Sequence, residues 1–220
     1  MPGRKRARTR RAPQQARSRD TERRLLDAAE AVLVKFGAEG TTLPRIAREA
    51  RVAPATVYRR FRDKEALMAA VFRRFAERSS AGTREAFNPE TVRPLGLAQF
   101  ATNVVQNMVR GFRASAPLTR AAMRYAELNP RLEAIRETGD SEARSFQQMV
   151  DTFLMWRDEI HHPDPEQAIR FAFLVVASML RDLITFDRMR LMQRVIAVDD
   201  ELLARELPRV FLSYLQRQGT

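Results

Sequence analysis

The sequence contains no cysteine, which excludes disulfide bridges, thiolate metal sites and cysteine nucleophiles. Histidine is almost as scarce, because His161 and His162 are the only two in the chain. No apolar run approaches the roughly 20 residues that a membrane-spanning helix needs. No apolar signal core follows the basic N-terminal residues. We therefore expect a cytoplasmic protein with no membrane partner.

Acidic residues are absent from the first 19 positions, and the excess positive charge is concentrated near that end. Residues 1–62 hold 17 Lys/Arg against 6 Asp/Glu, whereas residues 63–220 hold 22 against 21. Charge placed in this way favours a polyanionic partner. A membrane surface would require an apolar face beside the charge, which residues 1–19 lack. We expect residues 1–19 to be a disordered basic arm that follows a phosphate backbone or enters a minor groove.

Helical periodicity begins at Asp20, with Asp20 or Thr21 as the expected cap and Gly37 as the expected end. The apolar positions of this helix repeat every three to four residues: Leu25, Leu26, Ala29, Val32, Leu33 and Phe36. A second short helix is predicted over residues 42–50, with Thr42 as its N-cap and Pro44 in its first turn.

The stretch 52-VAPATVYRRFRDKEAL-67 predicts a third helix from Pro54 to about Phe61, because proline is tolerated at a helix start. Val57 and Phe61 share its inner face. The positions left for its outer face are Ala55, Thr56, Tyr58, Arg59 and Arg60. The hydroxyl and guanidinium groups among them are donors suited to phosphates and base edges. Asp63 is expected to cap a further helix over 64–78, whose Lys64 can reach a phosphate. Two short helices joined around Arg51 form a helix-turn-helix, although an ordinary three-helix core with a basic surface gives the same pattern.

The run TTLPRIAREARVAPATVYRRFRDKEAL resembles the N-terminal DNA-binding domain of TetR-family transcriptional regulators over about residues 21–70. The resemblance implies that Tyr58 and Lys64 contact phosphate and that Thr42 opens the second helix. It implies base-reading positions at Pro54, Ala55, Thr56, Arg59 and Arg60.

Two residues depart from the pattern of that family. Arg51 stands where glycine is usual, and in a backbone with positive φ it costs roughly 1 kcal/mol relative to glycine. A phosphate contact by Arg51 would offset this cost. Ala53 stands where Ser or Thr is usual, which removes a side-chain cap worth about 1 kcal/mol.

The remaining two thirds of the chain also reads as helices, so the predicted fold class is all-α. We expect a break near Ala116-Pro117, helices over 118–127, 131–156, 166–186 and 199–217, and a loop at 161–165. The predicted organisation is a basic arm (1–19), a helix-turn-helix domain (20–78) and a larger helical domain (79–220). His161 and His162 lie in the loop beside Asp164, and we predict no metal site there because no third ligand is evident.

The resemblance implies that the larger domain forms a homodimer through its last two long helices and encloses a small-molecule pocket. The helix over 166–186 is apolar on too many sides for a surface helix, which fits a dimer interface or the central helix of a monomer. Large adaptable or aromatic residues suggest a mostly apolar ligand, although each of them alone could be ordinary core. These candidate ligand-binding residues are Met108, Phe112, Met123, Met149, Phe153, Trp156 and Phe171.

We therefore predict a dimeric transcriptional regulator that binds an inverted-repeat operator in double-stranded DNA. The expected mode of regulation is repression that a small-molecule effector relieves. The alternative is a sequence-neutral architectural DNA-binding protein, whose affinity would depend steeply on salt. No nucleophile–base pair, glycine-rich phosphate loop or metal constellation is readable, so we predict neither an enzyme nor a cofactor.

Overall fold

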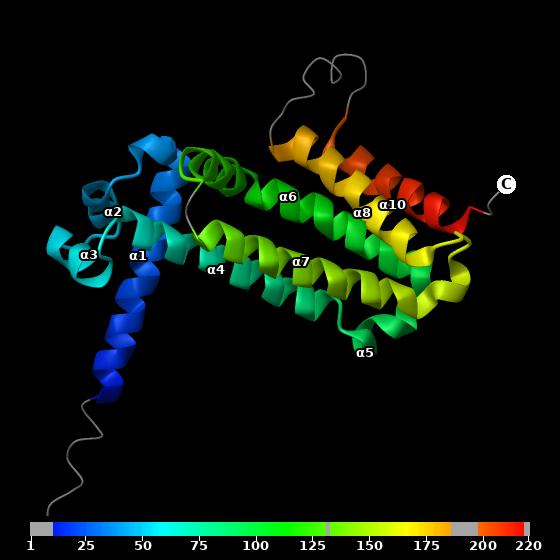
Figure 1. The fold of residues 1–220 in the computed structure, drawn as a ribbon, viewed down its shortest axis with the longest axis horizontal. Helices are drawn as coiled ribbons and strands as arrows, with labels where there is room; N and C mark the ends of the chain where they lie inside the picture. Colours follow the sequence, from blue (N-terminus) through cyan, green and yellow to red (C-terminus); the bar gives the residue numbers. More distant parts are fainter. Residues whose placement is uncertain (1–10, 131–132, 186–197, 218–220) are drawn as a thin grey trace, which may run out of the picture. The chain divides into compact units, whose positions relative to one another are not determined.

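The computed structural model describes residues 11–130, 133–185 and 198–217, and these ranges contain helices and turns but no strand, as the predicted all-α class requires (Figure 1). Short 3₁₀ segments (η1 and η2) and one π-helical turn (η3) join some of the helices. The elements are α1 (Arg11–Gly40), α2 (Leu43–Glu49), α3 (Pro54–Arg60), α4 (Lys64–Ala86), α5 (Pro89–Val92), η1 (Arg93–Leu95), α6 (Gly96–Leu128), α7 (Glu133–Phe153), η2 (Leu154–Glu159), α8 (Pro165–Leu180), η3 (Arg181–Thr185) and α10 (Asp200–Gln216).

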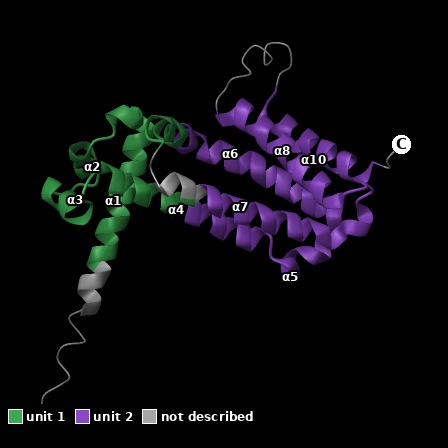
Figure 2. Ribbon diagram, viewed as in Figure 1, with its two compact units in different colours: residues 1–75, 121–137 green, residues 76–120, 138–220 purple. Residues whose placement is uncertain are grey.

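The chain divides into two compact units (Figure 2). Unit 1 comprises residues 1–75 and 121–137, and unit 2 comprises residues 76–120 and 138–220. The first boundary falls close to the predicted one between residues 78 and 79. The assignment of 121–137 to unit 1 is not readable from sequence, because it depends on contacts between distant segments.

Helix α1 begins earlier than the sequence pattern suggested. Its helical conformation starts at Arg11, so the prediction of a disordered arm is wrong for residues 11–19, and Asp20 and Thr21 lie inside the helix. Gln14, Gln15 and Ala16 favour helix, and the missing N–H of a proline is harmless in the first turn. The rest of the predicted arm, residues 1–10, lies outside the described ranges.

The end of α1 follows the prediction at Gly37, which interrupts the helix with φ of 69°. The hydroxyl of Thr41 donates to the Gly37 carbonyl over 2.7 Å and closes this turn. Leu25, Leu26, Ala29, Val32 and Leu33 are buried as expected. Phe36 is exposed instead, because its ring serves as a platform for the guanidinium of Arg45, 4.3 Å from the ring centroid.

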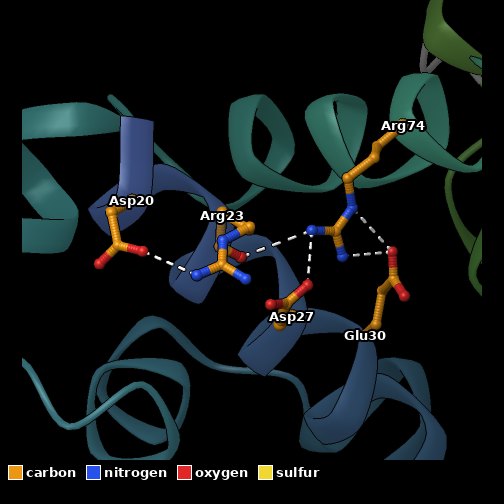
Figure 3. Close-up of polar contacts among 5 residues, drawn as sticks. All are labelled: Asp20, Arg23, Asp27, Glu30 and Arg74. Atoms are coloured by element: carbon orange, nitrogen blue, oxygen red, sulfur yellow. Dashed lines mark hydrogen bonds and ion pairs between the residues drawn. The ribbon is translucent and has the colours of Figure 1, made fainter. Parts of the chain in front are cut away.

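Arg74 holds α4 against α1 through two carboxylates (Figure 3). Its Nη1 lies 2.7 Å from the Asp27 carboxylate, and its Nη2 lies 2.5 Å from that of Glu30. The Arg74 side chain is only 17% exposed, so water screens these pairs less than it screens surface pairs. This network fixes the helix that precedes the helix-turn-helix to the helix that follows it.

Tyr125, near the end of α6, is part of the core of unit 1. Its ring lies 5.7 Å from that of Phe72 on α4, and the ammonium of Lys64 lies 5.3 Å from its centroid. Within the part of the chain that the structure describes, its hydroxyl is the one buried side-chain polar atom without a hydrogen-bond partner. Burial raises the pKa of Tyr125 to about 12, and the nearby carboxylates of Glu65 and Asp63 act in the same direction.

We predict that Tyr125 makes the protein less stable as pH rises above 10. The unfolded chain releases the phenol proton near pH 10 while the folded chain retains it, so the folded state loses about 1 kcal/mol between pH 9 and pH 11. The variant Tyr125→Phe removes this term, and it should also be at least as stable as the parent at pH 7 because no hydrogen bond is lost. Urea unfolding of both proteins at each pH measures the difference. Parallel losses of stability in the two proteins would contradict the prediction.

The core of unit 2 is built around aromatic rings on α6, α7, α8 and α10. The Phe153 ring lies 4.9 Å from that of Phe100 and 5.4 Å from that of Phe173, which lies 5.1 Å from Phe211. The predicted break near Ala116-Pro117 is wrong, because α6 continues through Pro117. One proline removes a single backbone hydrogen bond, and the bonds and packing on either side keep this helix continuous.

Helix α8 has two apolar faces of different character. One face is buried in the core of unit 2 through Ala168, Ile169, Ala172, Phe173, Val176 and Leu180. The other face leaves large apolar side chains exposed: Phe171, Leu174, Val175 and Met179. Helix α10 packs against α8, and Val210 on α10 is also exposed. Even so, none of the described helices combines the length and the hydropathy of a membrane span.

Candidate nucleic-acid interface

Helices α2 and α3 form the predicted helix-turn-helix. The Thr42 hydroxyl caps α2 by accepting from the N–H of Arg45 over 3.4 Å. Ala53 precedes α3 without a side-chain cap, as its residue type requires, and Pro54 occupies the first turn. Val57 and Phe61 are buried, so the opposite side of α3 faces away from the core.

The turn between the two helices adopts the left-handed backbone that the sequence suggested. Arg51 has φ of 55°, the one positive φ at a non-glycine position in the described residues. Arg24 of α1 stabilises the turn, since its Nη2 donates to the carbonyl of Ala50 over 2.7 Å and to that of Arg51 over 3.4 Å. These carbonyls follow the last turn of α2, and no backbone donor to either of them occurs among the described residues. Sequence reasoning missed Arg24 because it lies 26 residues before its partner.

The outward side of α3 combines small residues with two exposed polar ones. Tyr58 is 54% exposed and Arg59 is exposed, while Thr56 is half-buried between them and the core. Pro54 and Ala55 are exposed at the front of the helix, where their small size allows close approach to a groove. Arg51 is exposed in the adjoining turn. Most of the predicted DNA contacts therefore share one accessible face.

Arg60 behaves differently from its neighbour Arg59. Its Nη1 donates to the hydroxyl of Ser18 over 2.6 Å, and its Nη2 lies 2.5 Å from the carboxylate of Glu22. Both partners belong to α1, about 40 residues earlier in the chain, so no local pattern could show them. The guanidinium proposed for base reading is engaged in tying the end of α3 to α1, which makes Arg60 a positioning residue in this structure.

We predict that Arg60→Ala lowers DNA affinity without changing the preferred bases. The half-exposed ion pair with Glu22 is worth at most about 1 kcal/mol, so stability should fall only slightly. Selection of bound duplexes with the parent and the variant measures base preference. A changed consensus would assign Arg60 to base reading and contradict the positioning role.

Lys64 is less available than the sequence suggested. Its ammonium donates to the carbonyl of Ala38 over 3.0 Å and lies over the Tyr125 ring, so a phosphate contact would have to share it with these groups. The neighbouring prediction for Asp63 is confirmed, because its carboxylate accepts from the N–H of Ala66 over 2.7 Å and caps α4. That bond lowers the pKa of the Asp63 carboxyl.

The seven residues predicted to bind a ligand lie in different surroundings, and none of them lines either of the two hollows found among the described residues. Phe153 and Trp156 are buried core residues packed around Phe100. Met108, Phe112 and Met149 are partly buried against the same core. Phe171 is half exposed on α8 beside Tyr214, and Met123 is exposed in unit 1. Core packing accounts for the buried and partly buried members of this set, and a ligand contact by any of the seven stays a prediction.

His161 bonds to the end of α10, whereas the hydrogen bonds of His162 are to Asp164 in its own loop. The N–H of His161 donates to the Leu215 carbonyl over 2.9 Å, and its Nδ1 lies 3.1 Å from that of Gln216. No group of three or more potential metal ligands occurs among the residues with described positions.

This arrangement defines a helix-turn-helix protein of the class that presents a short helix to a DNA groove. Residues 25–71 match the model of the family described as bacterial regulatory proteins, tetR family. The match covers the helix-turn-helix domain and the helices on either side of it, and it agrees with the resemblance to TetR-family DNA-binding domains that the sequence shows over about residues 21–70. A curated relative from Bacillus subtilis (strain 168), the uncharacterized HTH-type transcriptional regulator YvkB, is 46% identical over 52 residues. That match covers 24% of this chain and 28% of the relative.

Solved structures extend the likeness of fold to nearly the whole chain. A TetR-family transcriptional regulator from Mesorhizobium loti is 22% identical, with a TM-score of 0.62 over 93% of this chain and 99% of that chain. FadR from Bacillus subtilis, in complex with stearoyl-CoA, is 16% identical, with a TM-score of 0.64 over 87% of this chain and 98% of that chain. At these identities the likeness concerns the fold alone.

Proposed function

We propose that this protein is a sequence-specific transcriptional regulator that binds DNA as a homodimer. The observation that carries the proposal is the exposed face of α3, where Pro54, Ala55, Tyr58 and Arg59 stand free of the core. Guanidinium and hydroxyl donors on such a helix suit guanine edges and phosphates. The other predicted contacts belong to adjoining elements: Thr42 caps α2, Arg51 lies in the turn, and Lys64 begins α4. They would hold α3 in place through the phosphate backbone of the DNA.

The dimer is proposed to form through the exposed apolar face of α8 and α10. Phe171, Leu174, Val175 and Met179 recur at three- and four-residue spacing along one side of α8, and Val210 is exposed on the adjacent helix. A symmetric interface over this face would cover apolar area that is otherwise in water. It would also give two reading helices, which a specific inverted-repeat site requires.

The proposed sense of regulation is repression relieved by an effector that binds unit 2. FadR from Bacillus subtilis was solved in complex with stearoyl-CoA, and NalD from Pseudomonas aeruginosa is described as a repressor of a multidrug efflux pump. An effector can release DNA only if it binds the DNA-free conformation more tightly than the bound one. We place this activity in the cytoplasm, where the chromosomal DNA of bacteria lies.

Mapping of the protein on the chromosome tests the proposal. The protein is cross-linked to DNA in the cells that make it, and the bound fragments are sequenced. A specific regulator gives a small number of sharp sites beside promoters, and deletion of its gene raises transcription there. Even coverage of the chromosome would favour the architectural alternative. If deletion of the gene lowers transcription beside the bound sites, the protein is an activator.

A further inference from the structure

A hollow of about 370 Å³ lies between α4 and α7 in unit 2, and every residue that lines it has a polar or charged side chain. Helix α4 contributes Glu77, Ser80 and Arg84. Helix α7 contributes Ser141, Arg144, Ser145 and Gln148. None of these residues belongs to the apolar set that the sequence suggested for a ligand.

The serines of this hollow form a hydrogen-bonded chain across the two helices. The hydroxyls of Ser80 and Ser141 lie 2.7 Å apart, and that of Ser145 donates to Ser80 over 3.2 Å. Two hydrogen bonds use two of the three hydroxyl protons, so one proton stays available to an acceptor in the hollow. Packed helices normally contact each other through apolar side chains. The contact between α4 and α7 at these serines lacks the stabilisation that buried apolar side chains would supply.

The two arginines add unpaired positive charge to the hollow. Arg84 and Arg144 are exposed, and no ion pair of either with a carboxylate occurs among the residues that the structure describes. Each guanidinium can therefore present a pair of N–H donors, the arrangement that matches a carboxylate or a phosphate.

Glu77 is the one acid of the lining, and it lies at the other end of the hollow from Arg84. Helices α4 and α7 run in the same direction, because Ser80 bonds to Ser141 while the later Thr152 hydroxyl donates to the Phe87 carbonyl over 3.3 Å. Arg84 lies one turn beyond Ser80 on α4, and Glu77 lies one turn before it. Arg84 and Gln148 therefore share the end of the hollow that is farther from Glu77.

We propose that this hollow binds the carboxylate or phosphate group of a small anionic effector. Arg84 and Arg144 would hold the anion, and the free serine proton and the Gln148 amide would complete its hydrogen bonds. The inference rests on the proposed function in one respect, since it takes the bound molecule to be the effector that relieves DNA binding.

Titration of the full-length protein with inorganic phosphate and with acetate, at constant ionic strength set with chloride, tests the site. Side-chain Nε–H signals of arginine report binding in NMR spectra. We expect saturable shifts at Arg84 and Arg144, at least tenfold weaker binding in the Arg84→Gln, Arg144→Gln double variant, and tighter binding in Glu77→Gln. Tighter binding of phosphate than of acetate would indicate that the effector carries a phosphate group, and the reverse order would indicate a carboxylate. Unsaturable shifts, or equal affinity in the double variant, would overturn the inference.

Arg93→Gln is the matched control, because Arg93 is another exposed arginine of unit 2 and does not line the hollow. It should bind the anions as the parent does, and thermal unfolding confirms that every variant is folded. DNA binding is measured separately on the same proteins without anion. If the parent protein binds a specific DNA sequence but neither anion, this inference fails and the proposed function stands. If it binds an anion in the hollow but selects no DNA sequence, the proposed function fails alone.

Discussion

Replacement of Leu174 by glutamate is expected to convert the proposed dimer into monomers and to weaken binding to an inverted-repeat duplex by about 100-fold or more. Leu174 is 59% exposed, yet it lies within the apolar stripe formed by Phe171, Val175 and Met179 on α8. In a symmetric interface each subunit contributes the same residue, so the variant buries two unpaired carboxylates. Each costs several kcal/mol to desolvate, whereas the exposed position leaves the isolated subunit folded.

Sedimentation equilibrium measures the association state, and titration of a labelled duplex measures affinity. Ala98→Glu is the control, since Ala98 is an exposed apolar residue on α6 and does not belong to the α8 stripe. The control variant should remain dimeric and bind DNA as the parent does. A Leu174→Glu protein that stays dimeric with full affinity would show that the subunits associate through another surface.

Replacement of Arg59 by alanine is expected to change which base is preferred at one position of each half-site. Arg59 is exposed on α3 and, unlike Arg60, has no described partner within the protein. A bidentate contact from arginine to a guanine contributes about 1–3 kcal/mol of discrimination, so affinity for the best site should fall roughly 10- to 100-fold. Affinity for unrelated duplexes should fall much less.

Two other substitutions separate charge from base reading. Arg48→Ala removes an exposed charge from α2, and Tyr58→Ala removes the exposed phenol of α3. Both should weaken binding to all duplexes about equally and leave the consensus unchanged. Duplex selection with each variant measures the preferences. A uniform loss for Arg59→Ala would assign Arg59 to the phosphate backbone.

The helix-turn-helix was readable from sequence because its determinants are local. Thr42 and Asp63 mark helix starts by residue type, Gly37 marks a helix end, and Val57 and Phe61 mark a buried face by their spacing. These features involve residues within a few positions of one another, so propensity and periodicity report them.

The features that sequence could not supply depend on contacts between distant segments. Arg60 pairs with Glu22, and Tyr125 packs on Phe72 from a helix that begins in the other unit. Composition also does not separate core residues from ligand-binding ones. Phe153 packs in the core, whereas the polar residues of the hollow between α4 and α7 look in the sequence like an ordinary helix surface.

Selection of bound duplexes from a random pool, with the purified full-length protein at near-physiological salt, tests the central claim most directly. A dimeric regulator that reads bases through α3 predicts enrichment of an inverted repeat whose half-sites lie about one helical turn of DNA, or a multiple of it, apart. Binding without enrichment, and its steady loss as salt rises, would contradict the account and leave a DNA-binding protein without a specific operator.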